Sequence, residues 1–271
     1  MQRILRGLCG RLERLSINRI NWLKTLYFNF RTLPWKEARH LPFYIYGSPA
    51  FNNLSGKIDI QCPIKRGMFK INVQHEFAPC LQTADSQLVL CGKLILRGCM
   101  NIGCGTKIII TGDAVLDIGA NVVITDFCNI DCCKRIEIGN DTRIAHRSQL
   151  MDSNHHFVVS TAKRTIADNM HPISIGRSCW ICNTVTFTAG AKVPDFCIVG
   201  SHSLVNKDFT SQGPDNLIAG TPAKVVASGV FRVFDYTTEQ MLIDHFAQGG
   251  STYAIPEGTD LEFFRKMPPS L

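Results

Sequence analysis

The chain has 271 residues, of which 45% are hydrophobic and 19% are charged. This composition excludes a disordered chain, because so large an apolar share can form a core that offsets the ordering entropy. No apolar run approaches the roughly 20 residues of a membrane-spanning helix. Arg6, Arg11 and Arg14 interrupt any apolar signal-peptide segment, so we expect a cytoplasmic protein.

The net charge of +7 comes from the N-terminal segment, because residues 1–40 contain nine Lys and Arg but only Glu13 and Glu37. An apolar stripe in this segment consists of Ile4, Leu8, Leu12 and Leu15. It predicts either an amphipathic helix packed on the main domain or a peripheral contact with the inner membrane surface. No nucleic-acid-binding motif accompanies the charge, so nucleic acid is not expected as a partner.

Twelve cysteines are many for this length. Without a signal peptide we do not expect them to form disulfides. Cys179 and Cys182 have the spacing of a redox or zinc pair, but no second pair accompanies them. We therefore expect no metal, and interpret several cysteines as small apolar residues of the repeat described next.

An apolar residue recurs at every sixth position of the chain. In the C-terminal half these positions are Ile175, Ile181, Phe187, Val193, Val199 and Val205. Four places after each of the first five comes a mostly small residue: Cys179, Val185, Ala191, Cys197 and Ser203. The same register appears earlier in three runs: Leu90, Leu96, Ile102 and Ile108, then Ile118, Ile124 and Ile130, then Ile138, Ile144 and Leu150.

A period of six fits neither a helix nor a plain strand. It indicates a coil of short parallel strands, in which three hexads make one triangular turn and the large residues fill the interior. Glycine or asparagine after the interior residue, as at Gly176, Gly200 and Asn206, is interpreted as a corner with unusual backbone angles. Each coil covers the apolar face of its neighbour, so the stack needs caps at both ends.

We therefore expect an all-β protein in three parts. Residues 1–50 form a basic cap with helical or extended structure, residues 51–228 form the β-helix, and residues 229–271 form a tail that starts with a short helix from Thr238 to Phe246. The register is lost over residues 151–172, a polar stretch that includes His155, His156 and His171. A long polar excursion from a rigid solenoid predicts the functional loop.

The hexads, the loop with its histidines, the segment ISIGRSCWIC and the closing NLIAGTPAKVV together resemble the left-handed parallel β-helix acyltransferases, also called hexapeptide-repeat acyltransferases. The resemblance is to the branch of galactoside, maltose and xenobiotic O-acetyltransferases, and within it to the O-acetyltransferases of bacterial surface-polysaccharide clusters. It covers roughly residues 20–228. It implies a left-handed parallel β-helix that moves an acetyl group from acetyl-CoA to a sugar hydroxyl, with no metal required.

In that family a loop histidine is the general base, because imidazole titrates near neutral pH. The galactoside-type pattern selects His155, whereas the pattern Asp-Thr-Asp-x-His of some relatives selects His156. We favour His155 as the base, with His156 lining the acceptor pocket and Asp152 or Asn154 orienting the imidazole. His146, His171 and His202 are expected to be structural or exposed.

The resemblance also implies a site for acetyl-CoA along the coils, between neighbouring subunits of a homotrimer. Trp180 would flank the active site, and the backbone of Cys182 and of Ser201 would contact the pantetheine arm. Asn206, Lys207 and Lys224 would lie near the adenine and the phosphates, where a lysine acts as a point charge. For Lys207 and Lys224 the alternative is a solvated surface residue, and for Trp180 it is coil packing.

Three other functions are weighed against the O-acetyltransferase. An N-acetyltransferase acting on an amino or nucleotide sugar would use the same chemistry on an amine. A γ-type carbonic anhydrase needs two zinc-binding histidines five residues apart, and no pair here has that spacing. A non-catalytic β-helix would bind no acetyl-CoA.

Overall fold

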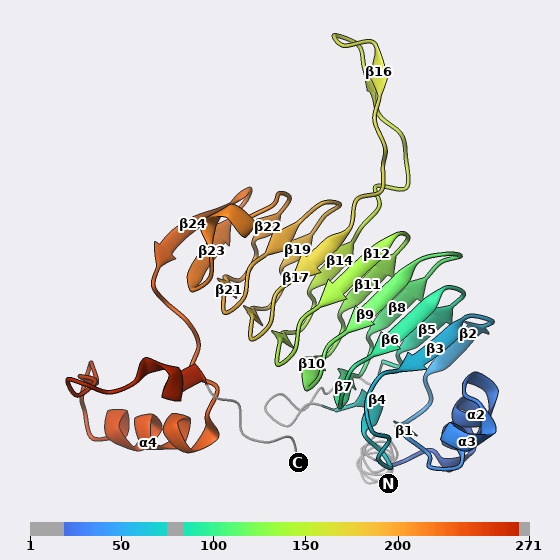
Figure 1. The fold of residues 1–271 in the computed structure, drawn as a ribbon, viewed down its shortest axis with the longest axis horizontal. Coiled ribbons are helices and arrows are strands. Elements are labelled where there is room, and N and C mark those ends of the chain that lie inside the picture. Colours follow the sequence, from blue (N-terminus) through green and yellow to red (C-terminus); the bar gives the residue numbers. More distant parts are fainter. Residues whose placement is uncertain (1–18, 75–83, 266–271) are drawn as a thin grey trace, which may run out of the picture.

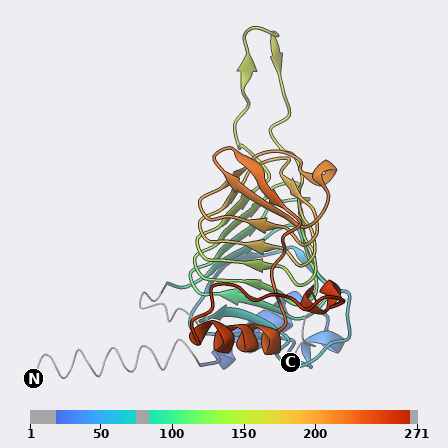
Figure 2. The same ribbon diagram turned by 90° about the vertical axis from the view of Figure 1, so that its left-hand side faces the viewer.

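The computed structural model describes residues 19–74 and 84–265. The apolar stripe from Ile4 to Leu15 lies outside these residues. The described chain winds through three sheets of parallel strands, which form the faces of a triangular prism (Figure 1, Figure 2). Each coil passes from the nine-stranded sheet to the seven-stranded sheet and then to the six-stranded sheet. The predicted left-handed parallel β-helix is confirmed.

The strand bounds are as follows. The nine-stranded sheet contains β1 (Phe43–Ile45), β4 (Phe69–Val73), β7 (Met100–Gly103), β10 (Val122–Ile124), β13 (Arg143–Ile144), β18 (Trp180–Ile181), β21 (Ile198–Val199), β23 (Asn216–Gly220) and the antiparallel β24 (Ala223–Ser228). The seven-stranded sheet contains β2 (Ala50–Leu54), β5 (Gln87–Leu90), β8 (Lys107–Ile110), β11 (Asn129–Cys132), β14 (Gln149–Met151), β19 (Thr186–Phe187) and β22 (Leu204–Val205). The six-stranded sheet contains β3 (Lys57–Ile60), β6 (Lys93–Leu96), β9 (Val115–Ile118), β12 (Arg135–Ile138), β17 (Ile173–Ile175) and β20 (Lys192–Val193).

The six-residue repeat places its apolar side chains in three stacked columns inside the prism, one column on each sheet. In the nine-stranded sheet the column is Ile45, Ile71, Ile102, Ile124, Ile144, Ile181, Val199 and Ile218. In the seven-stranded sheet Ile130 pairs with Leu150, and Leu150 pairs with Phe187. All these side chains are nearly or fully buried. Stacking like on like gives every coil an apolar neighbour above and below, and burial of this kind is the main stabilising contribution to the fold.

From Ile102 to Val199, and apart from the loop 151–172, the coils shorten along the chain, and their extra residues gather at one corner. Equivalent interior residues lie 22 apart from Ile102 to Ile124, 20 apart from Ile124 to Ile144, and 18 apart from Ile181 to Val199. In the longer coils the surplus falls between the seven-stranded and six-stranded sheets. The loop 151–172 leaves the prism at this same corner, after β14 and before β17, and carries the antiparallel pair β15 (Val159–Ser160) and β16 (Thr165–Ile166) away from the coils (Figure 1).

The expectation that glycine follows the interior residue because of corner angles is wrong. The left-handed backbone falls two places later, on non-glycine residues such as Asn121, Asp141 and Thr184. Gly176 has another reason: a Cβ built there would meet the backbone nitrogen of Asp195 on the next coil at 2.5 Å. Glycine is therefore required at this position because adjacent coils approach too closely for a side chain.

The N-terminal end of the prism is closed by α2 (Trp22–Thr32) and α3 (Trp35–Ala38) (Figure 1). Asn21 caps α2 by accepting a hydrogen bond from the Lys24 amide. The buried Asn29 side chain ties α2 to β1, since it donates to the Phe43 carbonyl and accepts from the Phe43 amide. The first parallel strand thus begins at Phe43, inside the segment expected to be a separate cap.

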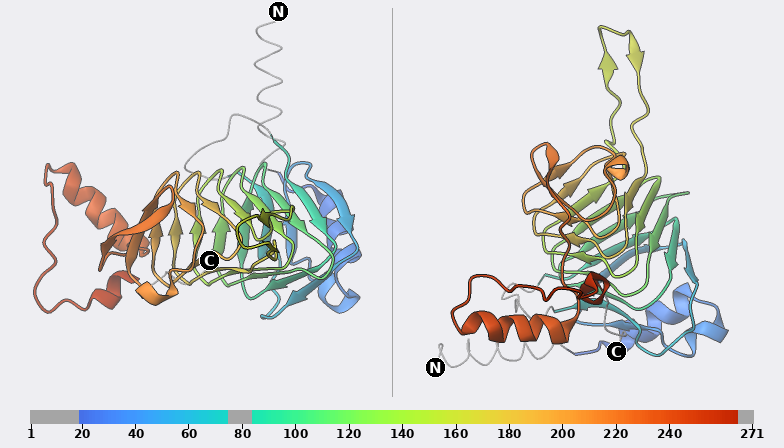
Figure 3. Two further views of the ribbon diagram at one scale, coloured as in Figure 1. Left: turned by 90° about the horizontal axis from the view of Figure 1, so that it is seen from above. Right: turned by 60° about the vertical axis from the view of Figure 1, so that its left-hand side comes forward.

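The tail leaves the last coil after β24 and contains α4 (Tyr236–Ala247) and a short 3-10 helix, η2 (Leu261–Arg265). It lies beyond the C-terminal coils, at the end of the prism opposite α2 and α3 (Figure 1, Figure 3). Helix α4 includes the helix expected from Thr238 to Phe246. Within the described ranges, no helix has the length and apolar character needed to cross a bilayer.

Gly176→Ala is expected to lower the free energy of unfolding by about 1–3 kcal/mol, because its methyl group has to push two coils apart. Gly200→Ala is the matched control. Gly200 also follows an interior residue, but a Cβ there would lie 3.1 Å from the Ala219 methyl group and no nearer than 3.8 Å to backbone atoms. Chemical denaturation of both variants measures the difference, and equal losses would contradict a specific role for coil-to-coil approach.

Candidate active site

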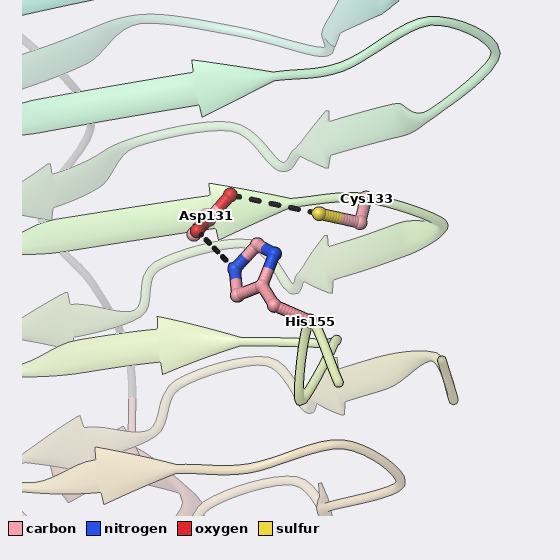
Figure 4. Close-up of side chains that lie close together, drawn as sticks. All are labelled: Asp131, Cys133 and His155. Atoms are coloured by element: carbon pink, nitrogen blue, oxygen red, sulfur yellow. Dashed lines mark hydrogen bonds and ion pairs between the residues drawn. The ribbon is translucent and has the colours of Figure 1, made fainter. Parts of the chain in front are cut away.

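His155 lies at the point where the loop leaves β14. Its Nε2 atom is 2.9 Å from Oδ2 of Asp131, and its side chain is 51% exposed while that of Asp131 is 15% exposed (Figure 4). The backbone of His155 is left-handed, with φ of 58°, and its amide donates to the Ser153 hydroxyl. The imidazole is thus held on one side and open to solvent on the other.

Asp131 reaches His155 because of the coil register. Residues 129–131 of β11 pair with residues 149–151 of β14, so Asp131 lies directly next to Met151, four residues before the histidine. Ile130 and Cys132 point into the prism and are fully buried, so the alternation of a strand puts Asp131 and Cys133 on the outer surface. The carboxylate therefore faces the loop that starts one coil further on.

The Asp131 contact fixes which imidazole nitrogen is free. An ionised carboxylate can only accept hydrogen bonds, so the proton of the neutral ring is assigned to Nε2. Nδ1 is then the nitrogen with a lone pair available to accept a proton. This orientation by a carboxylate is the arrangement that general-base catalysis by histidine requires.

Asp152 does not orient the imidazole, and neither does Asn154, contrary to the prediction. The fully buried Asp152 carboxylate accepts hydrogen bonds from the backbone amides of Cys133, Lys134 and Arg135, at 2.7, 2.8 and 2.7 Å. These hydrogen bonds hold the lengthened corner between β11 and β12, on the coil that precedes the loop. Because that corner follows directly after Asp131, Asp152 also fixes the position of the acid that contacts His155.

Cys133 completes a cluster with Asp131 and His155. One ligand atom from each residue lies within 4.8 Å of the other two, and the Cys133 thiol is 3.7 Å from Oδ1 of Asp131 (Figure 4). Burial raises the pKa of the Cys133 thiol, and the nearby Asp131 carboxylate raises it further. In the absence of a bound cation the thiol is therefore protonated and donates to Asp131.

His156 follows His155 directly and is exposed. Its amide donates to the Asn154 carbonyl at 2.7 Å, and the described contacts of its side chain include no carboxylate. His146, His171 and His202 are also exposed, as expected. Of the two predicted base candidates, His155 is the one that has an orienting partner.

Trp180 lies on β18 in the nine-stranded sheet and is partly exposed. The guanidinium group of Arg232, from the tail, lies 5.2 Å from the Trp180 ring centroid. Arg143 is next to Trp180 in the sheet. Burial lowers the pKa of Arg143 to about 10, and the positive charge of Arg232 contributes to that shift. Arg232 is also paired with Glu239, at 3.3 Å. Two guanidinium groups therefore lie near one aromatic ring with a single paired carboxylate, which favours an anionic ligand there.

The other predicted cofactor residues divide between two corners. Cys182 and Ser201 follow strands of the nine-stranded sheet on consecutive coils, and the Ser201 hydroxyl donates to the Asn183 side chain at 2.7 Å. Asn206 and Lys207 follow β22, at the same corner as the loop, and are exposed. Lys207 lies over the Phe209 ring at 5.0 Å, and Lys224 is exposed on β24.

The chain thus brings His155 to Asp131 and Cys133, but not to Trp180. The hydrogen bonds and ion pairs of His155 within the described part of the chain involve Ser153 and Asp131, and none involves the six predicted cofactor residues. An open groove runs over the six-stranded sheet, and its lining includes charged residues such as Arg97, Asp117 and Arg177 but none of the eight predicted site residues.

Four residues of the site were missed in the sequence: Asp131, Cys133, Arg143 and Arg232. Asp131 could have been found by placing each hexad above its predecessor, because Leu150 stacks on Ile130 and this brings the following acid under the loop. Arg143 follows from the same alignment, since Ile144 stacks on Ile181 and Arg143 on Trp180. Arg232 could not have been found by this alignment, because it lies in the tail, which contains no hexads.

No family model matches the chain. A curated relative from Escherichia coli (strain K12), named "Putative lipopolysaccharide biosynthesis O-acetyl transferase WbbJ", is 28% identical over 133 residues. That match covers 46% of this chain and 66% of the relative, slightly less than two thirds of its length.

Among solved structures, the polysialic-acid-specific acetyltransferase NeuO overlaps 76% of this chain and 98% of its own, with 17% identity and a TM-score of 0.47. The polysialic acid O-acetyltransferase OatWY overlaps 74% of this chain and 100% of its own, with 18% identity and a TM-score of 0.45. These scores carry no argument about activity, and the fold rests on the strand pairing itself. The curated relative confirms, as a likeness in sequence, the predicted resemblance to O-acetyltransferases of surface-polysaccharide biosynthesis.

Proposed function

We propose that the protein transfers the acetyl group of acetyl-CoA to a hydroxyl group of a sugar or glycan, in the biosynthesis of a surface polysaccharide. The observation that carries the proposal is the His155 imidazole, held by Asp131 where the coil is interrupted. The curated relative, whose name describes an O-acetyl transferase of lipopolysaccharide biosynthesis, supports the same reaction and acceptor class.

In this reaction the acceptor hydroxyl binds within hydrogen-bond reach of Nδ1 of His155. The imidazole takes the proton while the hydroxyl oxygen attacks the thioester carbonyl, and Asp131 stabilises the imidazolium that forms. The tetrahedral intermediate then collapses, the carbon–sulfur bond breaks, and the imidazolium returns the proton to the CoA thiolate. The products are the acetyl ester and free CoA, and no proton is gained or lost overall.

The CoA donor is assigned to the surface around Trp180, Cys182 and Ser201. The support for this assignment is electrostatic, since CoA carries several negative phosphate charges and Arg143 and Arg232 bring two positive charges to Trp180. Asn206, Lys207 and Lys224 are assigned to the adenine and phosphate end, as the family resemblance implies. Exposed lysines of this kind act as point charges for phosphate.

A homotrimer would bring the proposed base, His155, next to the proposed CoA-binding surface at Trp180 of a neighbouring subunit. His155 follows the seven-stranded sheet, whereas Trp180 belongs to the nine-stranded sheet of the same chain. A triangular prism offers flat faces for neighbours, so a second copy can present its Trp180 surface to the His155 corner. The N-acetyltransferase alternative needs the same assembly and the same base, and differs only in the acceptor atom.

Peripheral membrane contact is assigned to the outer surface of α2 and α3. Its exposed large apolar side chains are Trp22, Leu23, Leu26, Tyr27, Phe30 and Trp35. Around them lie the exposed basic residues Arg31, Lys36, Arg39 and Arg66. Trp and Tyr side chains combined with basic ones suit an anionic bilayer surface, where lipid-linked glycans would be presented.

His155→Ala is expected to lower turnover by about two to four orders of magnitude, because the general base is lost, and to leave acetyl-CoA affinity nearly unchanged. His156→Ala is the matched control, and should keep most of the turnover. Acetyl-CoA cleavage in the presence of a sugar acceptor measures both variants. If His156→Ala abolishes turnover while His155→Ala does not, the base is His156 and the assignment is wrong by one residue.

Asp131→Ala should reduce kcat by about a hundredfold with little change in KM for acetyl-CoA, since it releases the imidazole from its working orientation without touching the donor. Steady-state kinetics measure the two constants separately. Asp131→Asn, which keeps an oxygen acceptor for Nε2–H, should recover part of kcat. A loss that appears only in KM, or the absence of recovery in Asp131→Asn, would contradict the positioning role.

Sedimentation velocity is expected to give the mass of three chains. A monomer that retains full activity would contradict a site shared between subunits. Because the trimer is proposed to unite His155 with the Trp180 of a neighbour, mixing His155→Ala chains with Trp180→Ala chains should restore some activity in mixed trimers. Two inactive variants that never complement each other would place both residues in one chain's site.

Vesicles that contain anionic lipid should co-sediment with the protein, and vesicles of zwitterionic lipid should bind it less, because of the basic residues around α2. The double variant Leu23→Ser and Trp35→Ser should lose binding, whereas Leu261→Ser, an exposed apolar residue of the tail, should keep it. A double variant that binds vesicles normally but changes its oligomeric state would assign this surface to contacts between copies instead.

A further inference from the structure

The Asp131, Cys133 and His155 cluster combines three different metal-ligating groups on a rigid base. Asp131 belongs to β11 and Cys133 follows it directly at the corner, while His155 comes from the next coil. Each offers one ligand atom, and these atoms lie within 4.8 Å of one another. A carboxylate, a thiolate and an imidazole are all zinc ligands, and three protein ligands plus water are typical of an accessible zinc site.

We infer that Asp131, Cys133 and His155 form a site for Zn²⁺, and that zinc bound there blocks the proposed acetyl transfer. Ligand atoms around a tetrahedral zinc ion are roughly 3.3–3.5 Å apart, given zinc–ligand bonds of about 2.0–2.3 Å. Oδ2 of Asp131 is 2.9 Å from His155 Nε2, Oδ1 of Asp131 is 3.7 Å from the Cys133 thiol, and one ligand atom from each of the three residues lies within 4.8 Å of the other two. Small side-chain rotations suffice to accommodate the ion.

The surroundings of the cluster support a cation. Asp152 holds the corner from below, with its carboxylate on the amides of residues 133–135, so the backbone of Cys133 is fixed before any metal binds. The exposed His155 leaves an open side for water as the fourth ligand. The nearby Lys134 ammonium group is engaged elsewhere, with Asp168 and the Met170 carbonyl, and so does not neutralise Asp131.

Zinc binding and base catalysis exclude each other at His155. When Nε2 ligates the ion, the ring's proton moves from Nε2 to Nδ1, and the thiol of Cys133 releases its own proton to solvent. Nδ1 then carries hydrogen and can no longer accept a proton from a hydroxyl group. This inhibition rests on the proposed function, whereas zinc binding itself depends only on the three side chains.

Metal binding to the purified full-length protein, stripped with a chelator, tests the site without reference to activity. Calorimetry with Zn²⁺ alone should give one ion per chain, and Co²⁺ should give the strong near-ultraviolet absorption of a cobalt–thiolate bond. Cys133→Ser should weaken zinc binding by at least tenfold and abolish that absorption. Cys91→Ser, a partly buried thiol elsewhere on the coils, is the matched control and should leave both unchanged.

Activity then supplies the second readout. Zinc should inhibit acetyl transfer by the unmodified protein, and the activity of Cys133→Ser, compared with that variant's own zinc-free rate, should resist the inhibition. Binding that is identical in Cys133→Ser, or absent from the unmodified protein, overturns the inference. Cys133-dependent zinc binding by a protein that shows no acetyl transfer would uphold the metal site and reject the proposed function instead.

Discussion

The stacking of each coil on its predecessor determines the structure and positions the site. Interior residues such as Ile130, Leu150 and Phe187 lie directly above one another, and their burial leaves no freedom to shift by one residue. A shift by one would turn the apolar side chains outward and the polar ones inward. The positions of outward-facing residues are therefore as closely fixed as those of the core, and this is how Asp131 comes to face His155.

From Ile102 onward, one corner of the prism departs from this regularity. Coils that elsewhere need 18 residues take 20 or 22, and the extra residues fall between the seven-stranded and six-stranded sheets. The loop 151–172 is the largest of these departures. Asp152, buried at its base, binds the backbone of the corner beneath, so the loop starts from a rigid point although its outer part projects away from the coils. The imidazole proposed as the general base can thus lie on a loop and still be held by the fold.

The fold could be predicted from the sequence because one apolar residue at every sixth position is enough to identify the repeat. Ile144, Ile181 and Val199 are apolar at the right spacing, and the structure stacks them as expected. The role of Gly176 was not predicted, because both a close approach between coils and an unusual backbone angle favour glycine, and the sequence does not distinguish them. The orienting acid was sought near His155 in sequence, at Asp152 or Asn154, whereas the register supplies Asp131 from 24 residues away. Arg232 lies in the tail, where there is no period to align.

The central claim is that an imidazole held beside the coils activates a hydroxyl group toward acetyl-CoA. It is tested most directly by measuring release of free CoA from acetyl-CoA across a panel of sugars and nucleotide sugars, with a variant in which both His155 and His156 are alanine as the control. We expect CoA release that depends on a hydroxyl-bearing acceptor and disappears in the double variant. Acceptor-dependent release that survives the loss of both histidines, or no release with any member of the panel, would contradict it.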